Sequence, residues 1–169
     1  MTPAVSRRKL VAVVLASGAL SACGFKLRGS QSFGFRRIAI YPNPGGAIAQ
    51  TLRRSFGTGV QVLPADAPLT QAQVVLNMPL EQRDKVVVGS NASGQVREFQ
   101  LRLRVRFSAS TPQGAELLPS DSIALQRDFS YNESAALAKE TEEALLYRDM
   151  ENDIVAQILR RLATIKPAP

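Results

Sequence analysis

The sequence predicts an α+β fold, a two-layer sandwich with two helices packed on one face of a mixed or mostly antiparallel sheet of about four strands. Three observations support this prediction. Residues 98–107 alternate strictly between apolar and polar side chains, which is typical of a strand with one buried and one solvated face. A turn rich in glycine, serine and asparagine separates them from an earlier alternating segment, as in a hairpin. Residues 137–162 then change to the three- and four-residue spacing of a helix.

The first part of the chain predicts short elements. Residues 36–41 read as a strand with isoleucines on one side and a proline at its end. A helix follows from about residue 46 to residue 57, because apolar residues recur every four positions and a glycine ends the pattern. Residues 61–63 form a brief extended piece, and residues 64–68 form a loop.

The middle of the chain predicts three longer strands. The first covers residues 74–88 and alternates from Val74 to Leu80. Because Pro79 cannot donate a ladder hydrogen bond, this strand lies at an edge or carries a bulge. The turn at 89–94 joins it to the strand at 98–107. After a loop at 111–120, the apolar residues at positions 123, 125, 129 and 131 predict a third strand, antiparallel to the middle one.

The last element is a helix over residues 137–162. Glutamates gather near its start and arginines near its end, which is the distribution that the helix dipole favours. Its apolar stripe needs a surface to cover, and the apolar face of the sheet provides one.

The N-terminus predicts export and lipidation. A basic cluster at residues 7–9 precedes an apolar run at residues 10–20, which is the order of a secretory signal peptide and too short to span a bilayer. The run ends in LSAC, which resembles a lipobox with Cys23 as the lipidated residue. We therefore expect a signal peptide at 1–22 and a single periplasmic domain at 23–169. Gly24 stands where an inner-membrane retention signal would place Asp, which favours the outer membrane.

Two alternatives to this interpretation of the N-terminus remain. An ordinary secretory signal with a chance cysteine would leave the protein without a lipid. Ser6, Arg7 and Arg8 also suggest twin-arginine export, which would change the export route and not the anchor.

The charge of the chain is unevenly distributed. The formal net charge is +7, and +4 remains after removal of the three basic residues of the signal. Residues 24–106 hold twelve Lys or Arg against four Asp or Glu, whereas residues 107–169 hold six against ten. A basic half fits nucleic acid, anionic lipid or an acidic protein. A periplasmic location favours anionic lipid and argues against nucleic acid.

The usual catalytic and cofactor signatures are missing from the sequence. The chain has no histidine, and its one cysteine is assigned to the lipid. It contains no phosphate-binding glycine loop and no Gly-x-Ser-x-Gly motif. Glu142 and Glu143 are adjacent, but on a helix they are expected to lie on a solvated face. We therefore predict a protein that is not an enzyme and has no cofactor or metal.

Arginines form the first candidate surface. Arg102, Arg104 and Arg106 lie on one face of the middle strand, about 6.6 Å apart along it. They either form the solvated face of a half-buried sheet or meet an acidic or phosphate-bearing counterpart, since like charges in a row repel one another.

Topology predicts a second candidate site. If the three long strands are sequential antiparallel neighbours, Arg97 after the hairpin turn and Lys139 after the returning strand lie at one end of the sheet, with the turn beside Lys139. Two cations beside apolar Leu137 and Phe99 would suit a phosphorylated glycolipid.

Several segments resemble one family along nearly the whole chain after the signal peptide. They are CGFKLRG (23–29), GQVREFQL entering the middle strand, and YNESAALAKE (131–140) followed by the long helix ending in ILRRL. With these segments the chain resembles the LptE family of lipopolysaccharide-assembly lipoproteins, formerly called rare lipoprotein B. The ALAK segment before an acidic helix is the most specific of them.

The resemblance implies partners and site residues. The partner of this chain would be the outer-membrane β-barrel LptD, whose lumen the lipoprotein enters as a plug. The two proteins together would insert lipopolysaccharide into the outer leaflet. The family lysine implicated in glycolipid binding falls on Lys139. A second family cation falls on Ala92, so Arg97 or Lys85 would have to replace it. A purely structural plug, or a periplasmic hydrolase with an unrecognised carboxylate pair, are the alternatives.

Overall fold

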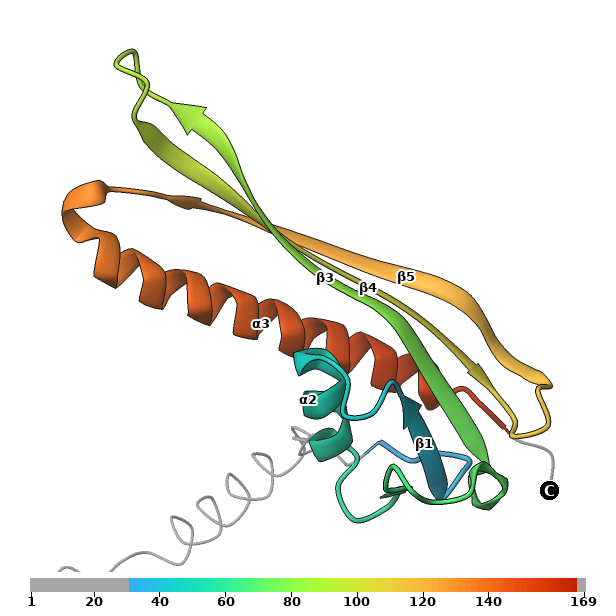
Figure 1. Cartoon of the computed structure of the whole chain (residues 1–169). Coiled ribbons are helices and arrows are strands. Elements are labelled where there is room, and N and C mark those ends of the chain that lie inside the picture. Colours follow the sequence, from blue (N-terminus) through green and yellow to red (C-terminus); the bar gives the residue numbers. More distant parts are fainter. Residues whose placement is uncertain (1–30, 167–169) are drawn as a thin grey trace, which may run out of the picture. The chain divides into compact units, whose positions relative to one another are not determined.

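The computed structural model describes residues 31–166, which form a five-stranded sheet and two α-helices (Figure 1). The elements are β1 (Arg37–Tyr41), α2 (Ala47–Ser55), β2 (Gln61–Val62), β3 (Val74–Ser90), β4 (Val96–Ser110), β5 (Glu116–Ser130) and α3 (Ala136–Leu162), with short 3-10 turns at Leu69–Gln71 and Glu133–Ala135. This confirms the α+β class, with one strand more than expected. The predicted signal peptide and Cys23 lie outside the described residues.

The sheet is mixed, with the strand order β2-β1-β3-β4-β5. β1 pairs in parallel with β2 and β3, whereas β3, β4 and β5 are antiparallel neighbours in chain order, as predicted. β5 begins at Glu116, so the predicted loop at 111–120 is shorter than expected. Polar residues and Pro119 suggested a loop there, but an edge strand accepts both.

The core lies between the apolar face of the sheet and the two helices. Leu101, Leu103, Val105 and Phe107 of β4 are fully buried. α3 covers them with its apolar stripe, and α2 contributes residues to the same core cluster. Figure 1 shows both helices on one side of the sheet, which confirms the predicted two layers.

β3 contains a bulge that changes which side chains face the helices. Asn77 pairs with Ser108, but Leu80 pairs with Arg106, so three steps along β3 match two along β4. Such an extra residue exchanges the two faces of the strand beyond it. Leu80 therefore lies on the polar face with Arg106, instead of continuing the apolar row that the sequence suggested. Pro79 lies within the irregularity, beyond the last residue of β3 that pairs with β1.

The polar face of the sheet is covered at one end. Ala39, Leu63 and Ala72 form a small buried cluster on the segment around β1. Over β4 the polar face carries exposed arginines. Among the described helices, none is long and apolar enough to cross a membrane. Within residues 31–166, no group of three His, Cys, Asp or Glu is arranged to hold a metal ion.

Candidate functional site

The distal end is the part of the domain formed by residues 85–99 of the β3–β4 hairpin, the end of β5 and the first turns of α3 (residues 129–143). β5 is last paired at Ser130, opposite Glu98, while the hairpin continues to a turn closed by a hydrogen bond from the Gly94 N–H to the Asn91 carbonyl. The hairpin tip therefore projects beyond the end of β5 (Figure 1). All three predicted glycolipid-binding cations belong to this end.

Arg97 and Lys139 contact neighbouring residues at the end of β5. The Tyr131 N–H donates to the Arg97 carbonyl at 2.8 Å, and Lys139 Nζ lies 3.2 Å from Ser130 Oγ. This agrees with the sheet order that predicted a shared end, but the hairpin turn lies beyond the end of β5 and not beside Lys139, because β3 and β4 continue past their last pair with β5 (Figure 1). Their role in binding stays a prediction.

Both candidate lysines at the distal end form ion pairs with helix α3. Lys139 Nζ lies 2.7 Å from Glu142 Oε2, and Lys85 Nζ lies 2.6 Å from Glu143 Oε2. Lys85 also lies over the rings of Phe99 and Phe129, 4.4 and 5.6 Å from their centroids. The structure therefore brings Lys85 into the same region as Arg97 and Lys139.

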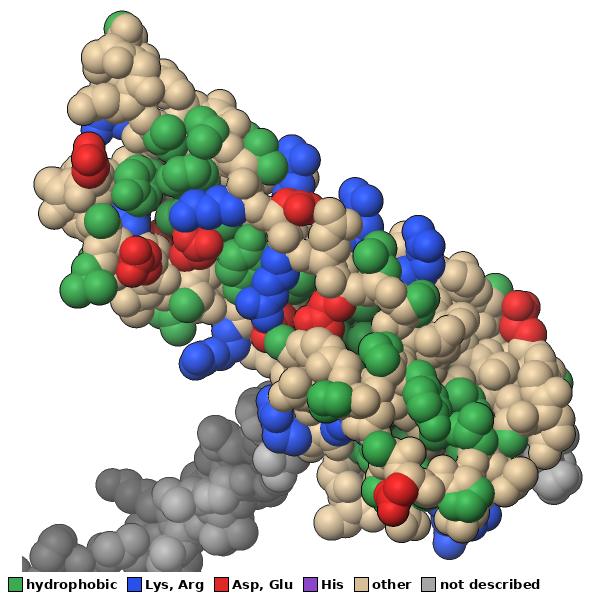
Figure 2. Space-filling view, in the orientation of Figure 1, with side chains coloured by type: hydrophobic (Ala, Val, Ile, Leu, Met, Phe, Trp, Pro, Cys, Tyr) green, Lys and Arg blue, Asp and Glu red, His purple; other side chains and the backbone are tan. Residues whose placement is uncertain are grey.

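Exposed apolar side chains lie at the same end of the domain as these cations. Leu137, at the start of α3, is 79% exposed, and Val87 and Val88 of the hairpin are 48% and 46% exposed. Figure 2 shows hydrophobic side chains gathered at this end of the molecule, with basic and acidic groups among them. Exposed apolar groups that cluster beside charges mark interaction sites more often than isolated ones do.

A charged rim of five residues lies where β3 meets the two helices. It consists of Glu81, Arg83 and Lys85 from β3 and of Glu143 and Glu151 from α3. Because of the bulge, the three β3 residues pair with buried β4 positions and lie on the helix side of the sheet. Arg83 pairs with Glu151, and both Glu81 carboxylate oxygens lie 3.2 Å from the Ile48 N–H at the start of α2.

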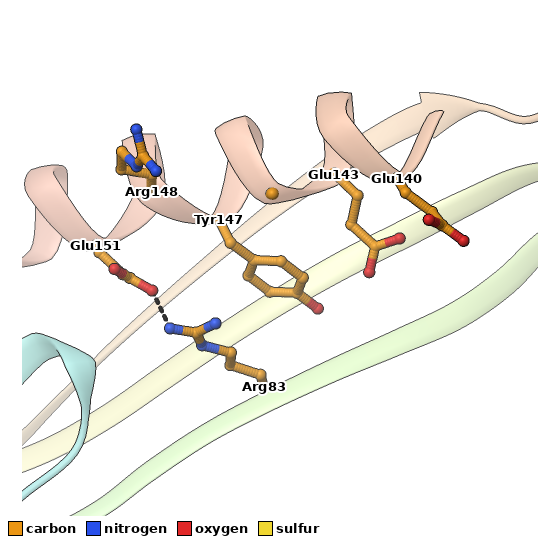
Figure 3. Close-up of a pocket in the computed structure, with 7 residues that line it drawn as sticks. Arg83, Glu140, Glu143, Tyr147, Arg148 and Glu151 are labelled. Atoms are coloured by element: carbon orange, nitrogen blue, oxygen red, sulfur yellow. Dashed lines mark hydrogen bonds and ion pairs between the residues drawn. The ribbon is translucent and has the colours of Figure 1, made fainter. Parts of the chain in front are cut away.

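The rim borders a pocket of about 490 Å³ between β3 and α3 (Figure 3). In Figure 3 the Tyr147 ring lies between Arg83 and Glu143, while Arg148 points away from them. Three glutamates and two arginines line the pocket, and Arg83 crosses it to reach Glu151. This arrangement holds the two layers together at the edge of the core.

Tyr147 connects α3 to β3. Its hydroxyl donates to the Asp84 carbonyl at 2.9 Å, and the Arg83 guanidinium lies 5.2 Å from its ring centroid. Burial raises the pKa of the Tyr147 hydroxyl above its ordinary value of 10.0, and the Glu143 carboxylate adds to the rise. The neutral hydroxyl is therefore the form that the fold stabilises.

Replacing Tyr147 by phenylalanine should lower the free energy of unfolding by about 0.5–1.5 kcal/mol at pH 7, the usual range for one hydrogen bond. Above pH 10 the tyrosine of the unfolded chain ionises while that of the folded chain keeps its proton, so the wild type loses stability as the pH rises through the raised pKa. The difference between the proteins should therefore shrink in urea titrations at pH 11. A difference that stays constant from pH 8 to pH 11 would contradict this role.

The arginine column comprises Arg102, Arg104 and Arg106 on the exposed face of β4. Arg102 Nε donates to Gln100 Oε1 at 2.8 Å, whereas within residues 31–166 Arg104 and Arg106 form no side-chain hydrogen bond or ion pair. Beside Arg102 and Arg104 the small side chain of Ala124 borders a hollow of about 360 Å³. Most of this positive charge is thus available to a partner.

Two acidic residues of the rim were not predicted from the sequence. Glu143 was expected on a solvated face, but it faces β3, with its side chain 22% exposed. Glu151 is almost buried. The spacing 143, 147, 151 follows the sheet-facing stripe of α3, and this signal could have identified both.

Comparisons with known proteins agree with the resemblance seen in the sequence. The model of the LptE family, described as "Lipopolysaccharide-assembly", matches residues 35–162. The LPS-assembly lipoprotein LptE of Pectobacterium atrosepticum is 26% identical over 167 residues, covering 94% of this chain and 88% of that protein. LptE of Photorhabdus laumondii subsp. laumondii is also 26% identical over 167 residues, covering 96% and 90%.

Solved structures share the fold. The solution structure of an uncharacterized lipoprotein B from Nitrosomonas europaea has a TM-score of 0.70 and 33% sequence identity, covering 83% of this chain and 90% of that chain. The crystal structure of rare lipoprotein B from Shewanella oneidensis has a TM-score of 0.62 and 22% identity, covering 76% and 95%. The similarity to the Shewanella oneidensis protein concerns the fold alone.

Proposed function

Since the chain belongs to the LptE family of lipopolysaccharide-assembly proteins, we propose that it binds lipopolysaccharide at its distal end and plugs the outer-membrane β-barrel LptD. The family gives the chain a role in lipopolysaccharide assembly. The direct contacts with the glycolipid and with the barrel are the proposal.

One observation carries the glycolipid contact: cations and exposed apolar side chains lie together at the distal end. Lys139, Arg97 and Lys85 supply positive charge, and Leu137 and Val87 supply apolar surface. Lipopolysaccharide combines phosphorylated sugars with acyl chains, so a ligand of this class needs both kinds of contact. Charge-assisted contacts to phosphate are among the stronger hydrogen bonds.

The arginine column supports the contact with the barrel. It lies on the face of the sheet opposite both helices, where within the described residues two of its three arginines have no side-chain partner. An acidic inner wall of the barrel would complement the positive charge of the arginine column. The arginine column and the lysine ion pairs lie on opposite faces of the sheet. Contact of the column with the barrel would therefore leave the distal end free for the glycolipid.

The anchor and the absence of catalysis complete the proposal. A lipid on Cys23 would hold the domain at the periplasmic face of the outer membrane, although this residue lies outside the described part of the chain. The role is non-catalytic, in keeping with a sequence that has no histidine.

Binding of labelled lipopolysaccharide by the full chain, held through a C-terminal tag in mild detergent, tests the glycolipid contact. The Lys139→Glu, Arg97→Glu double variant should bind at least about 100-fold more weakly, because each phosphate contact to a charged group contributes about 1.5–3 kcal/mol and two such contacts are lost. Arg97→Gln and Lys85→Gln, tested singly, would show which cation acts with Lys139.

The matched control is Arg36→Glu with Arg54→Glu, which makes the same change in net charge at exposed positions of the opposite part of the domain. It should bind as the wild type does. Equal binding by the folded Lys139→Glu, Arg97→Glu variant would remove both residues from the site. A wild type that binds no lipopolysaccharide but still co-purifies with the barrel would favour the purely structural plug.

A further inference from the structure

We infer that Glu142 and Glu143 compete with the ligand for Lys139 and Lys85, so that each phosphate must displace an internal carboxylate in order to bind. This inference rests on the proposed function, because it concerns the same cations. It assigns a role to two acidic residues that oppose the binding of an anion.

The geometry places one carboxylate on each lysine. Glu142 lies one helical turn after Lys139 on α3, with 2.7 Å between Nζ and Oε2. The next residue, Glu143, reaches across to β3 and lies 2.6 Å from Lys85 Nζ. Two successive residues of one helix thus hold two cations that come from different layers of the domain.

The surroundings of the lysines explain why the cations stay in place when a carboxylate leaves. Lys85 Nζ lies over the Phe99 ring, 4.4 Å from its centroid, and cation–π attraction does not depend on Glu143. Lys139 Nζ keeps its contact with Ser130 Oγ. The lysine side chain at position 139 is only 19% exposed, so its ammonium group is confined near the end of β5.

The energies of these contacts favour the exchange of a carboxylate for a phosphate. Partly exposed ion pairs of this kind contribute little to stability, because solvent screens them and two side chains must be ordered. A phosphate group carries more charge than a carboxylate and offers more acceptor oxygens. It therefore replaces the carboxylate, but the binding that results is weaker than an unpaired lysine would give. A protein that must pass its ligand on benefits from this weakening, since the carboxylates re-form their pairs as the ligand leaves.

The test uses the full chain and purified lipopolysaccharide as the probe. Glu142→Gln and Glu143→Gln should each bind lipopolysaccharide about two- to fivefold more tightly than the wild type, which matches the loss of one exposed ion pair. The double variant should bind about tenfold more tightly. Dissociation should slow by a similar factor, because the internal competitor is gone.

Glu140→Gln is the matched control, since it makes the same charge change on the same helix. Glu140 is exposed and forms no ion pair within residues 31–166. It should change binding by less than about twofold, because Glu140 pairs with neither lysine and solvent screens an exposed carboxylate. Glu142→Gln should also lose its effect in a Lys139→Gln background, and Glu143→Gln in a Lys85→Gln background.

Each outcome is decisive. Equal tightening by Glu140→Gln would mean that overall charge matters and not the ion pairs, and it would overturn the inference. A wild type that binds, with Glu142→Gln and Glu143→Gln unchanged, would overturn the inference and leave the proposed function intact. A wild type that binds no lipopolysaccharide would overturn both.

Discussion

Replacing Phe107 by alanine should lower the free energy of unfolding by about 3–5 kcal/mol, the usual cost of truncating a buried phenylalanine. Phe107 is 0% exposed and lies on the helix side of β4. Its ring also supports the Arg161 guanidinium, 5.4 Å from the ring centroid, and Arg161 in turn pairs with Asp121 of β5. The substitution therefore opens a cavity where the sheet meets the end of α3. Urea unfolding followed by circular dichroism measures the change.

Arg106→Ala is the control for this variant, because it is the neighbouring residue on the opposite face of β4. Arg106 is exposed, so its loss should change the free energy of unfolding by less than about 0.5 kcal/mol. Equal unfolding midpoints for Phe107→Ala and Arg106→Ala would show that the two layers do not meet over β4 as described.

Reversing the arginine column, with glutamate at positions 102, 104 and 106, should reduce recovery of the barrel partner at least about tenfold. The change replaces three cations that face an acidic surface in the proposed complex with three anions, and like charges across an interface cost several kcal/mol. Purification from outer membranes through a tag after Pro169, with the amount of LptD measured in the eluate, gives the readout.

A lysine triple variant at the same positions controls for charge. It keeps the positive face and loses only the planar guanidinium groups, so most of the barrel should still be recovered. Thermal unfolding of the soluble fraction checks that the glutamate variant folds, as expected for exposed positions. Recovery of LptD in full with three glutamates would exclude the arginine column from the interface.

The sequence predicted those elements whose own residues show a regular apolar pattern. β4 shows strict alternation because one face is fully buried, and α3 shows regular spacing because one stripe covers the sheet. β5 was recognised only from residue 123, since an edge strand with one exposed side tolerates the polar residues and the proline that also mark loops. The parallel pairing of β1 with β3 left no local signal, because it joins segments that are distant in the chain.

The candidate site was predictable in part. Sequential pairing of the long strands places Arg97 and Lys139 at one end, and the alternation of β4 places the arginine column on the polar face. The ion pairs of Lys85 and Arg83 with α3 were not predictable, because Pro79 indicated either an edge strand or a bulge without deciding between them, and because the sequence pattern does not give the rotation of α3 against the sheet.

The bulge between Asn77 and Leu80 decides which charges meet across the two layers. If the same residues of β3 paired with β4 without a bulge, Gln82 and Asp84 would turn toward α3, while Arg83 and Lys85 would turn to the other side of the sheet. An aspartate would then oppose the glutamates of α3 that now attract basic side chains. Pairing without this bulge would therefore convert attraction between strand and helix into repulsion, although no amino acid of the chain had changed.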